Sequence, residues 1–294
     1  MSKKTLFTGS GVAIITPFKE DGVDFDALAK LIDFQIENGT DAIIICGTTG
    51  EASTMPDEEH LSVISFAAEH TAGRIPVIAG TGSNDTAHGA ELCKMAEKAG
   101  ADGLLLVTPY YNKTTQRGLI QHYNAMAAAT DLPIILYNVP SRTGMNIDVS
   151  TVCELAKNEQ IVGIKDATGN IGYTAQLAAE CPDIDIYSGN DDMIVPIMSL
   201  GGKGVISVLA NVMPKETHDM CAKYLAGDLQ GSLKLQLELL DLVKALFIEV
   251  NPIPVKTAMN LMGYNGGKLR LPLYEMSEQN LAILKNALAK HGLI

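Results

Sequence analysis

The sequence lacks features that would place it in several large classes of protein. None of its 294 residues is tryptophan, and aromatic residues make up only 5% of the chain. The N-terminal segment, residues 1–7, is basic, but no long apolar segment follows it, so we expect neither a secretory signal nor a membrane-spanning helix. The formal net charge of −12 argues against nucleic acids and anionic membranes as partners, because both bind basic surfaces.

Motifs for metal binding and for hydrolysis are also missing. The six histidines are scattered, so we expect no metal site, and no serine lies in a nucleophile elbow. The cysteines contain no C-x-x-C pair. We therefore predict reduced, mostly buried thiols in a cytoplasmic protein. The residues concerned are Cys46, Cys93, Cys153, Cys181 and Cys221.

Short apolar runs recur along the first two thirds of the chain. Their hydrophobicity is continuous rather than alternating, which is typical of parallel strands covered on both faces. The eight runs are Gly11–Ile15, Ala42–Cys46, Pro76–Ala79, Gly103–Val107, Pro133–Tyr137, Ile161–Lys165, Ile184–Tyr187 and Gly204–Val208.

Segments with helical spacing lie between these runs. In the first, Asp24 is the expected N-cap and Asn38-Gly39 the stop. Strand and helix alternating eight times predict an α/β fold, the closed (β/α)8 or TIM barrel. The rival fold, a doubly wound open sheet, should carry a phosphate-binding fingerprint, and its nearest match, Gly80-Thr81-Gly82, is incomplete. The other predicted helices are Glu58–Thr71, Thr86–Lys98, Thr115–Ala129, Val149–Asn158, Tyr173–Glu180, Met193–Leu200 and Lys215–Ala226.

The pattern changes after Asp228. Three helical segments, Leu233–Ile248, Val255–Met262 and Glu278–Leu288, follow with no strand between them. We predict a catalytic barrel over residues 1–228 and a C-terminal three-helix appendix over residues 229–294.

One strand ends in a lysine, Lys165, inside an apolar run. Burial disfavours the ammonium ion and lowers the pKa of a lysine; alternatively, the side chain reaches solvent beyond the strand end. Tyr137 ends the preceding strand. Neighbouring strands lie about 4.8 Å apart, so the Tyr137 phenol could reach the amine of Lys165.

Other strand ends carry further polar groups. Gly47–Glu51 combines glycines with two hydroxyls, which suits either ligand contact or a plain turn. The tyrosines of Tyr110–Tyr111 are more often interface residues than catalysts. Arg142, one of four arginines, suits a carboxylate or a surface ion pair. The acids of Asp191–Asp192 could bind a metal or face a helix dipole. Lysine, tyrosine, threonine and arginine together favour imine chemistry on a ketone.

Four motifs carry a resemblance to a known family. They are Gly47–Glu51, Tyr137–Gly144, Gly163–Asp166 and Asn251–Lys256. The chain from about Gly9 to its C-terminus resembles the dihydrodipicolinate synthase family, which are pyruvate-dependent class I aldolases on a (β/α)8 barrel. The resemblance implies condensation of pyruvate with L-aspartate 4-semialdehyde, the first committed step toward lysine and diaminopimelate, without a cofactor.

The resemblance also implies roles for single residues. Lys165 matches the Schiff-base lysine and Tyr137 the general acid/base. Thr48 and Tyr111 match the rest of a proton relay. In the family, the tyrosine at Tyr111 completes the site of the neighbouring subunit. The resemblance therefore implies a homotetramer built from tight dimers, with Tyr110 and Tyr111 at the dimer contact.

Four residues match the substrate contacts. Thr49 matches a contact of the pyruvate carboxylate, and Arg142 matches the group that binds the carboxylate of the semialdehyde. Gly189 and Ile206 match residues that line the pyruvate pocket.

The resemblance is incomplete at a regulatory position. Lysine-inhibited members bind lysine through a tyrosine, an asparagine, two histidines and an acid. Tyr110 and Asn84 match, and His60 keeps one histidine, but Asp57 takes the place of the other and His88 replaces the acid. We predict that L-lysine inhibits this protein weakly or not at all.

Two alternatives share much of this inventory. N-acetylneuraminate lyases and 2-keto-3-deoxy sugar acid aldolases have the same barrel, lysine and tyrosine, but Thr48, Thr49 and Arg142 favour the synthase branch. A catalytically inactive barrel used as a ligand sensor would keep the pocket and form no imine.

Overall fold

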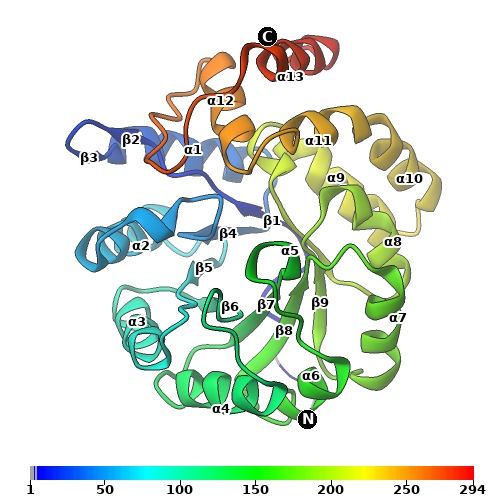
Figure 1. Cartoon of the computed structure of the whole chain (residues 1–294). Coiled ribbons are helices and arrows are strands. Elements are labelled where there is room, and N and C mark those ends of the chain that lie inside the picture. The colour runs from blue at the N-terminus through cyan, green and yellow to red at the C-terminus, as the bar shows by residue number, and fades with distance from the viewer. Residues whose placement is uncertain (1–2, 4) are drawn as a thin grey trace.

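A closed barrel of parallel strands forms the centre of the computed structural model, which describes residue 3 and residues 5–294 (Figure 1). Residues 1, 2 and 4 of the basic N-terminal segment lie outside the described residues. Every predicted strand is present, so the (β/α)8 prediction is confirmed. The strands are β1 (Gly9–Ala13), β4 (Ala42–Ile45), β5 (Val77–Gly80), β6 (Gly103–Val107), β7 (Ile134–Asn138), β8 (Ile161–Asp166), β9 (Asp185–Ser188) and β10 (Gly204–Ser207).

Helices surround the barrel and return the chain from each strand to the next (Figure 1). Asp24 begins the first of them, since its carboxylate accepts a hydrogen bond from the Ala27 amide at 3.0 Å. The helices are α1 (Phe25–Glu37), α2 (Asp57–Thr71), α3 (Thr86–Lys98), α4 (Gln116–Ala127), α6 (Val149–Leu155), α7 (Ile171–Glu180), α8 (Ile194–Ser199) and α9 (Pro214–Leu225).

Several short elements near the barrel mouth were not predicted. The strands β2 (Phe18–Lys19) and β3 (Gly22–Val23) pair as an antiparallel hairpin, and the helix α5 (Pro140–Thr143) follows β7. Each spans too few residues for a periodic pattern to show in the sequence.

The C-terminal region is helical as predicted, but the number of helices was wrong. Instead of one helix over Leu233–Ile248, the structure has two helices, α10 and α11, on either side of Leu239. Leu239 is buried, so the apolar pattern continues across the break and hides it. The four helices are α10 (Leu229–Glu238), α11 (Leu240–Leu246), α12 (Ile253–Leu261) and α13 (Glu278–Lys290).

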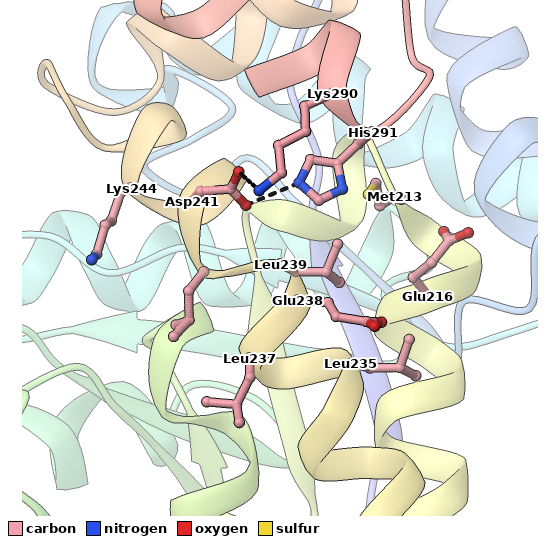
Figure 2. A pocket seen from close by; sticks show the side chains of 11 residues that line it. Met213, Glu216, Leu235, Leu237, Glu238, Leu239, Asp241, Lys244, Lys290 and His291 are labelled. Carbon is pink, nitrogen blue, oxygen red and sulfur yellow. Dashed lines mark hydrogen bonds and ion pairs between the residues drawn. The ribbon is translucent and has the colours of Figure 1, made fainter. Parts of the chain in front are cut away.

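An ion-pair cluster fastens the last helix to this region. Asp241 on α11 accepts hydrogen bonds from Lys290 at 2.6 Å and from His291 at 2.9 Å, at the end of α13 (Figure 2).

Among the described residues, no helix is long and apolar enough to cross a membrane.

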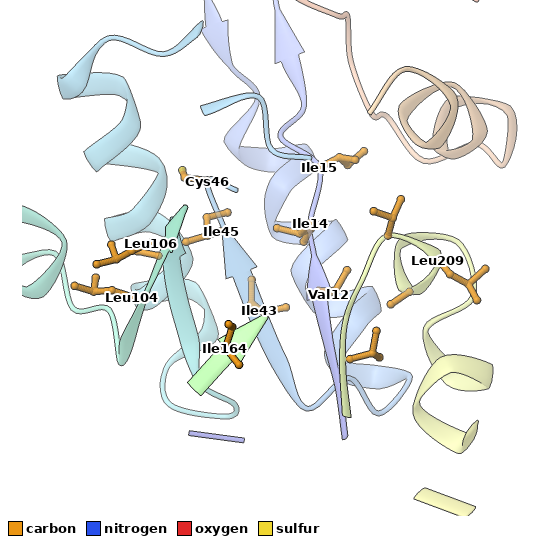
Figure 3. Packing of buried hydrophobic residues seen from close by; sticks show 14 of the residues in the cluster. Val12, Ile14, Ile15, Ile43, Ile45, Cys46, Leu104, Leu106, Ile164 and Leu209 are labelled. Carbon is orange, nitrogen blue, oxygen red and sulfur yellow. The ribbon is translucent and has the colours of Figure 1, made fainter. Parts of the chain in front are cut away.

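The core has an outer and an inner part, because successive strand residues point to opposite faces. Ile43 and Ile45 pack outward in the cluster that includes the inner faces of the helices (Figure 3). Ile44 belongs to the inner cluster, with Tyr137 and Ile206. Filling the barrel with side chains leaves the strand ends as the place for a ligand site.

The prediction of five reduced cysteines was wrong for one pair. Cys153 on α6 and Cys181 after α7 form a disulfide across a sequence separation of 28. These helices are neighbours around the barrel, and a spacing pattern alone could not show that the thiols meet. Cys46, Cys93 and Cys221 are free and buried, as predicted.

Candidate active site

A pocket opens at the carboxyl ends of β4 to β7. It has a volume of about 560 Å³. Its lining includes Thr48 and Tyr110 from the loops after β4 and β6, Tyr137 from the end of β7, and Arg142 from α5. The structure therefore brings together side chains from segments nearly 100 residues apart, as the barrel prediction required.

Lys165 and Tyr137 meet next to this pocket. They are direct partners in the pairing of β7 with β8, and the Lys165 Nζ lies 4.3 Å from the centre of the Tyr137 ring. Lys165 is only 6% exposed, so the alternative in which it reaches solvent is wrong. Burial lowers the pKa of Lys165 to about 8; the positive charge of Arg142 adds to this effect and the carboxyl of Asp191 opposes it.

Tyr137 keeps its phenolic proton at neutral pH. Burial raises the pKa of Tyr137, while Arg142 and the Thr48 side chain oppose that rise. A protonated phenol beside an amine that loses its proton readily is suited to general acid/base chemistry. The pair could therefore support attack of the Lys165 amine on a carbonyl carbon.

The loop after β4 holds its two threonines differently. Thr48 is exposed toward the pocket, whereas Thr49 is buried and its Oγ1 accepts a hydrogen bond from Asn251 Nδ2 at 3.0 Å. The loop ends at Glu51, which is buried, has a positive φ of 57° and accepts a 2.5 Å hydrogen bond from Lys256 Nζ. The hydrogen bonds from Asn251 and Lys256 therefore hold this loop against the C-terminal region.

Arg142 lies on α5 at the edge of the pocket, with an exposed side chain. Its Nη2 donates a 2.9 Å hydrogen bond to the backbone carbonyl of Asn251. No ion pair of Arg142 occurs among the described residues. The guanidinium keeps donors free to bind an incoming carboxylate.

Gly189 and Ile206 lie at neighbouring strand ends. A Cβ on Gly189 would lie 2.7 Å from the Cβ of Ala167 and 3.0 Å from the carbonyl oxygen of Asp166. Glycine is therefore needed where the chain after β9 passes the turn after β8. Ile206 is buried in the inner cluster that contains Tyr137.

Asp191 has a structural role. It is buried, and its carboxylate accepts hydrogen bonds from Ser207 Oγ at 2.6 Å and from the amides of Val208 and Leu209 at 3.0 and 2.9 Å. Its oxygens are thus engaged in joining β9 to β10. Within the described residues, no cluster of three or more potential metal ligands exists.

Tyr111 does not join the other site residues within the chain. It is 94% exposed with a φ of 68°, and it is not among the described residues that line the pocket. Tyr110, in contrast, lines the pocket. A large aromatic side chain this exposed is a candidate for contact with another subunit.

The five residues of the suspected regulatory site line another part of the same pocket: Asp57, His60, Asn84, His88 and Tyr110. His88 Nε2 lies 3.1 Å from both carboxylate oxygens of Asp57. His60 is buried and its Nε2 lies 2.9 Å from the carbonyl oxygen of Gly80. The Asp57 carboxylate and the His88 imidazole thus bind each other.

The sequence analysis missed two residues of the site. Asn251 and Lys256 contact the loop after β4, yet the motif Asn251–Lys256 served only to support the resemblance. Lys256 lies between apolar residues in a helical pattern, and this pattern could have indicated that its side chain is buried. In the structure Lys256 is only 1% exposed. Its partner, 205 positions away, carried no local signal.

A second hollow lies between α9, α10, α11 and α13 (Figure 2). It does not combine a lysine, a tyrosine and an arginine as the strand-end site does. Its lining includes leucines of α10 and α11, together with Asp241, which is already bound by Lys290 and His291. Neither Tyr137 nor Arg142 lines it.

Comparisons with known proteins agree on one family. The model of the Dihydrodipicolinate synthetase family matches residues 6–291. The chain is 61% identical over 290 residues to a 4-hydroxy-tetrahydrodipicolinate synthase of Caldicellulosiruptor bescii, covering 98% of both chains. It is 59% identical over 293 residues to the enzyme of the same name from Acetivibrio thermocellus, covering 99% of this chain and 100% of that one. A crystal structure of dihydrodipicolinate synthase from Aquifex aeolicus superposes with a TM-score of 0.96 at 49% identity, covering 98% of this chain and 99% of that chain.

Proposed function

The chain belongs to the dihydrodipicolinate synthetase family, and from this premise we infer that it condenses pyruvate with L-aspartate 4-semialdehyde. The product is 4-hydroxy-tetrahydrodipicolinate, in the first committed step of lysine and diaminopimelate biosynthesis, which makes the protein a lyase of small-molecule substrates. The observation that carries the assignment is the buried Lys165 in contact with the Tyr137 ring beside a pocket at the strand ends.

The reaction begins at the amine of Lys165. With a pKa of about 8, a useful fraction of this amine is neutral near pH 7 and can attack the ketone carbon of pyruvate. Loss of the carbonyl oxygen as water then leaves a protonated imine. Tyr137, whose ring centre lies 4.3 Å from the Lys165 Nζ, supplies the proton that this oxygen needs.

The imine draws electrons from the former methyl group of pyruvate. That carbon loses a proton and becomes an enamine nucleophile, which attacks the aldehyde carbon and forms the new carbon–carbon bond. The amine of the substrate then displaces Lys165 and closes the ring. Each of these steps uses acid and base groups of the protein and no cofactor.

A relay of hydroxyl groups moves the protons in this proposal. Tyr137 exchanges them with the substrate, Thr48 lies beside the Tyr137 phenol, and Tyr111 of a second copy completes the relay. The influence of the Thr48 side chain on the pKa of Tyr137 supports the first link. The exposure of Tyr111 supports the second.

The substrates are held through their carboxylates. Thr49 binds the carboxylate of pyruvate, and Gly189 and Ile206 shape the space for its short carbon chain. Arg142 binds the carboxylate of the semialdehyde at the pocket edge, where its exposed guanidinium is available.

We propose a cytoplasmic homotetramer built as a dimer of dimers, with Tyr110 and Tyr111 at the tight contact. We also propose that residues 229–294 act as a helical appendix to the barrel of residues 1–228. Contacts of Asn251 and Lys256 with the loop after β4 support this second proposal, because they tie the appendix to the site.

A substrate panel tests the assignment. We expect turnover of pyruvate with L-aspartate 4-semialdehyde and no cleavage of N-acetylneuraminate or of a 2-keto-3-deoxy sugar acid. Arg142→Ala should weaken use of the semialdehyde and leave imine formation with pyruvate intact. Preferred cleavage of a sugar acid would assign the chain to a sister activity, and binding of pyruvate without an imine would indicate a sensor.

A further inference from the structure

Asn251 contacts both of the groups proposed to bind substrate carboxylates. It lies in the segment between α11 and α12, far along the chain from either group, and is only 6% exposed. Its side-chain Nδ2 donates to Thr49 Oγ1 at 3.0 Å. Its backbone carbonyl accepts from Arg142 Nη2 at 2.9 Å. One residue thus links the two binding groups without being assigned a role of its own.

The direction of the hydrogen bond to Thr49 determines what Thr49 can offer a ligand. The NH2 group of an asparagine can only donate, so Thr49 Oγ1 must accept in this contact. A threonine hydroxyl has a single hydrogen. That hydrogen is therefore left for another acceptor, and a ligand carboxylate is an acceptor only.

The environment of the other end of the amide also favours a role beyond stability. Asn251 Oδ1 is buried and has no hydrogen-bond partner among the described residues. Burying an unpaired polar atom is unfavourable. The unpaired Oδ1 therefore makes asparagine unfavourable for stability at this position. The hydrogen bond that its Nδ2 donates to Thr49 gives a functional reason for the residue.

We propose that Asn251 is a positioning residue for the pyruvate carboxylate. It orients the hydroxyl hydrogen of Thr49 toward the carboxylate, and its carbonyl holds Arg142 at a fixed distance from Thr49. This inference rests on the proposed function, because it takes Thr49 and Arg142 as the two carboxylate-binding groups.

Asn251→Asp tests the proposal by reversing the polarity of the contact. The replacement has nearly the same shape, but its carboxylate only accepts, so Thr49 donates to it and no longer to pyruvate. We expect the KM for pyruvate to rise roughly tenfold or more, as for the loss of one hydrogen bond to a charged group. The KM for the semialdehyde should rise much less, since the backbone carbonyl that holds Arg142 remains. An unchanged KM for pyruvate would overturn the proposal.

A double-mutant cycle shows whether Asn251 acts through Thr49. If it does, adding Asn251→Ala to Thr49→Val should raise the KM for pyruvate little further, because the hydroxyl to be oriented is already gone. Fully additive effects, or equal rises in both KM values, would show that Asn251 is merely structural and would overturn the proposal.

A matched control replaces another asparagine of the same region. Asn260 on α12 binds Gly266 and Gly267 outside the pocket, and Asn260→Asp should leave both KM values unchanged. Failure of the proposed function itself is distinguishable. It would appear as an unmodified wild-type protein after borohydride reduction with pyruvate, whereas failure of the present inference leaves that trapping intact.

Discussion

Two lysines are buried among the described residues, and their surroundings give them different chemistry. Lys256 donates to the carboxylate of Glu51 at 2.5 Å and to the carbonyl of Lys268 at 2.6 Å. Burial lowers the pKa of Lys256, and Glu51 opposes that effect at close range. Lys165 instead faces the ring of Tyr137. Only Lys165 therefore combines an amine that loses its proton readily with a neighbouring acid/base group.

The lowered pKa of Lys165 predicts the pH dependence of imine formation. The attacking amine must be neutral, so its rate of attack should rise with pH and level off above about 8, the pKa of Lys165. An unperturbed lysine would continue to gain rate up to about 10.5. Single-turnover rates with excess pyruvate across this range provide the measurement. A rate that keeps rising tenfold per pH unit beyond pH 9 would contradict the assigned pKa.

The presence of Asp57 and His88 at positions where the resemblance implies a histidine and an acid predicts weak inhibition by L-lysine. His88 cannot supply the carboxylate that an ammonium ion needs, and the carboxylate of Asp57 is already bound to His88. Loss of a charge-assisted hydrogen bond of about 1.5–3 kcal/mol lowers affinity roughly ten- to a hundredfold. Rates across a lysine titration at saturating substrates measure the effect.

The paired substitution Asp57→His with His88→Glu should increase sensitivity to lysine, because it introduces the histidine and the acid that the resemblance implies for lysine-inhibited members. His88→Glu alone serves as the control, since it places two carboxylates side by side. Strong inhibition of the unmodified protein would refute the prediction.

Strand-end reasoning predicted part of the site and missed part of it. Lys165 and Tyr137 were paired correctly because both end neighbouring parallel strands, whose register then brings them together. Asn251 was missed because it lies outside any strand, and its partner Thr49 is 202 positions away. The disulfide between Cys153 and Cys181 was missed because spacing along the chain does not show that α6 and α7 bring the two thiols together.

At the scale of elements, periodicity predicted what is long and buried. Continuous apolar runs marked every barrel strand to within about two residues. The junction between α10 and α11 left no signal because Leu239 is as apolar as its neighbours. The two-residue strands β2 and β3 are held by their pairing with each other, which local sequence does not encode strongly.

The buried ion pair between Glu51 and Lys256 joins α12 to the loop after β4. Lys256→Met should destabilise the protein by about 3–5 kcal/mol, because it leaves the Glu51 carboxylate buried without its partner. Glu51→Gln combined with Lys256→Met should recover much of this loss, since glutamine is neutral and can still accept from the amide of Arg270. Urea unfolding of both variants measures the difference. A double variant no more stable than Lys256→Met would contradict this account.

At the scale of the whole molecule, the position of Tyr111 predicts shared active sites. A chain carrying Tyr111→Phe and a chain carrying Lys165→Ala should each have little activity alone. When the two are co-expressed, one site of a mixed dimer has an intact Lys165 and receives an intact Tyr111, so activity should return.

Tyr137→Phe co-expressed with Lys165→Ala provides the control, because both residues belong to the same chain's site. That mixture should stay inactive, since neither site in the mixed dimer is complete. If the Tyr111 mixture also stays inactive although mixed dimers form, the shared-site proposal is wrong.

The central claim is that Lys165 forms an imine with pyruvate, and one measurement tests it directly. The protein is treated with borohydride in the presence of pyruvate, its activity is measured, and the modified residue is located by peptide mass spectrometry. Lys256, the other buried lysine, serves as an internal control. We predict a reduced pyruvate adduct on Lys165, none on Lys256, and loss of activity. An adduct on any other lysine, or activity that survives without an adduct, would contradict the account.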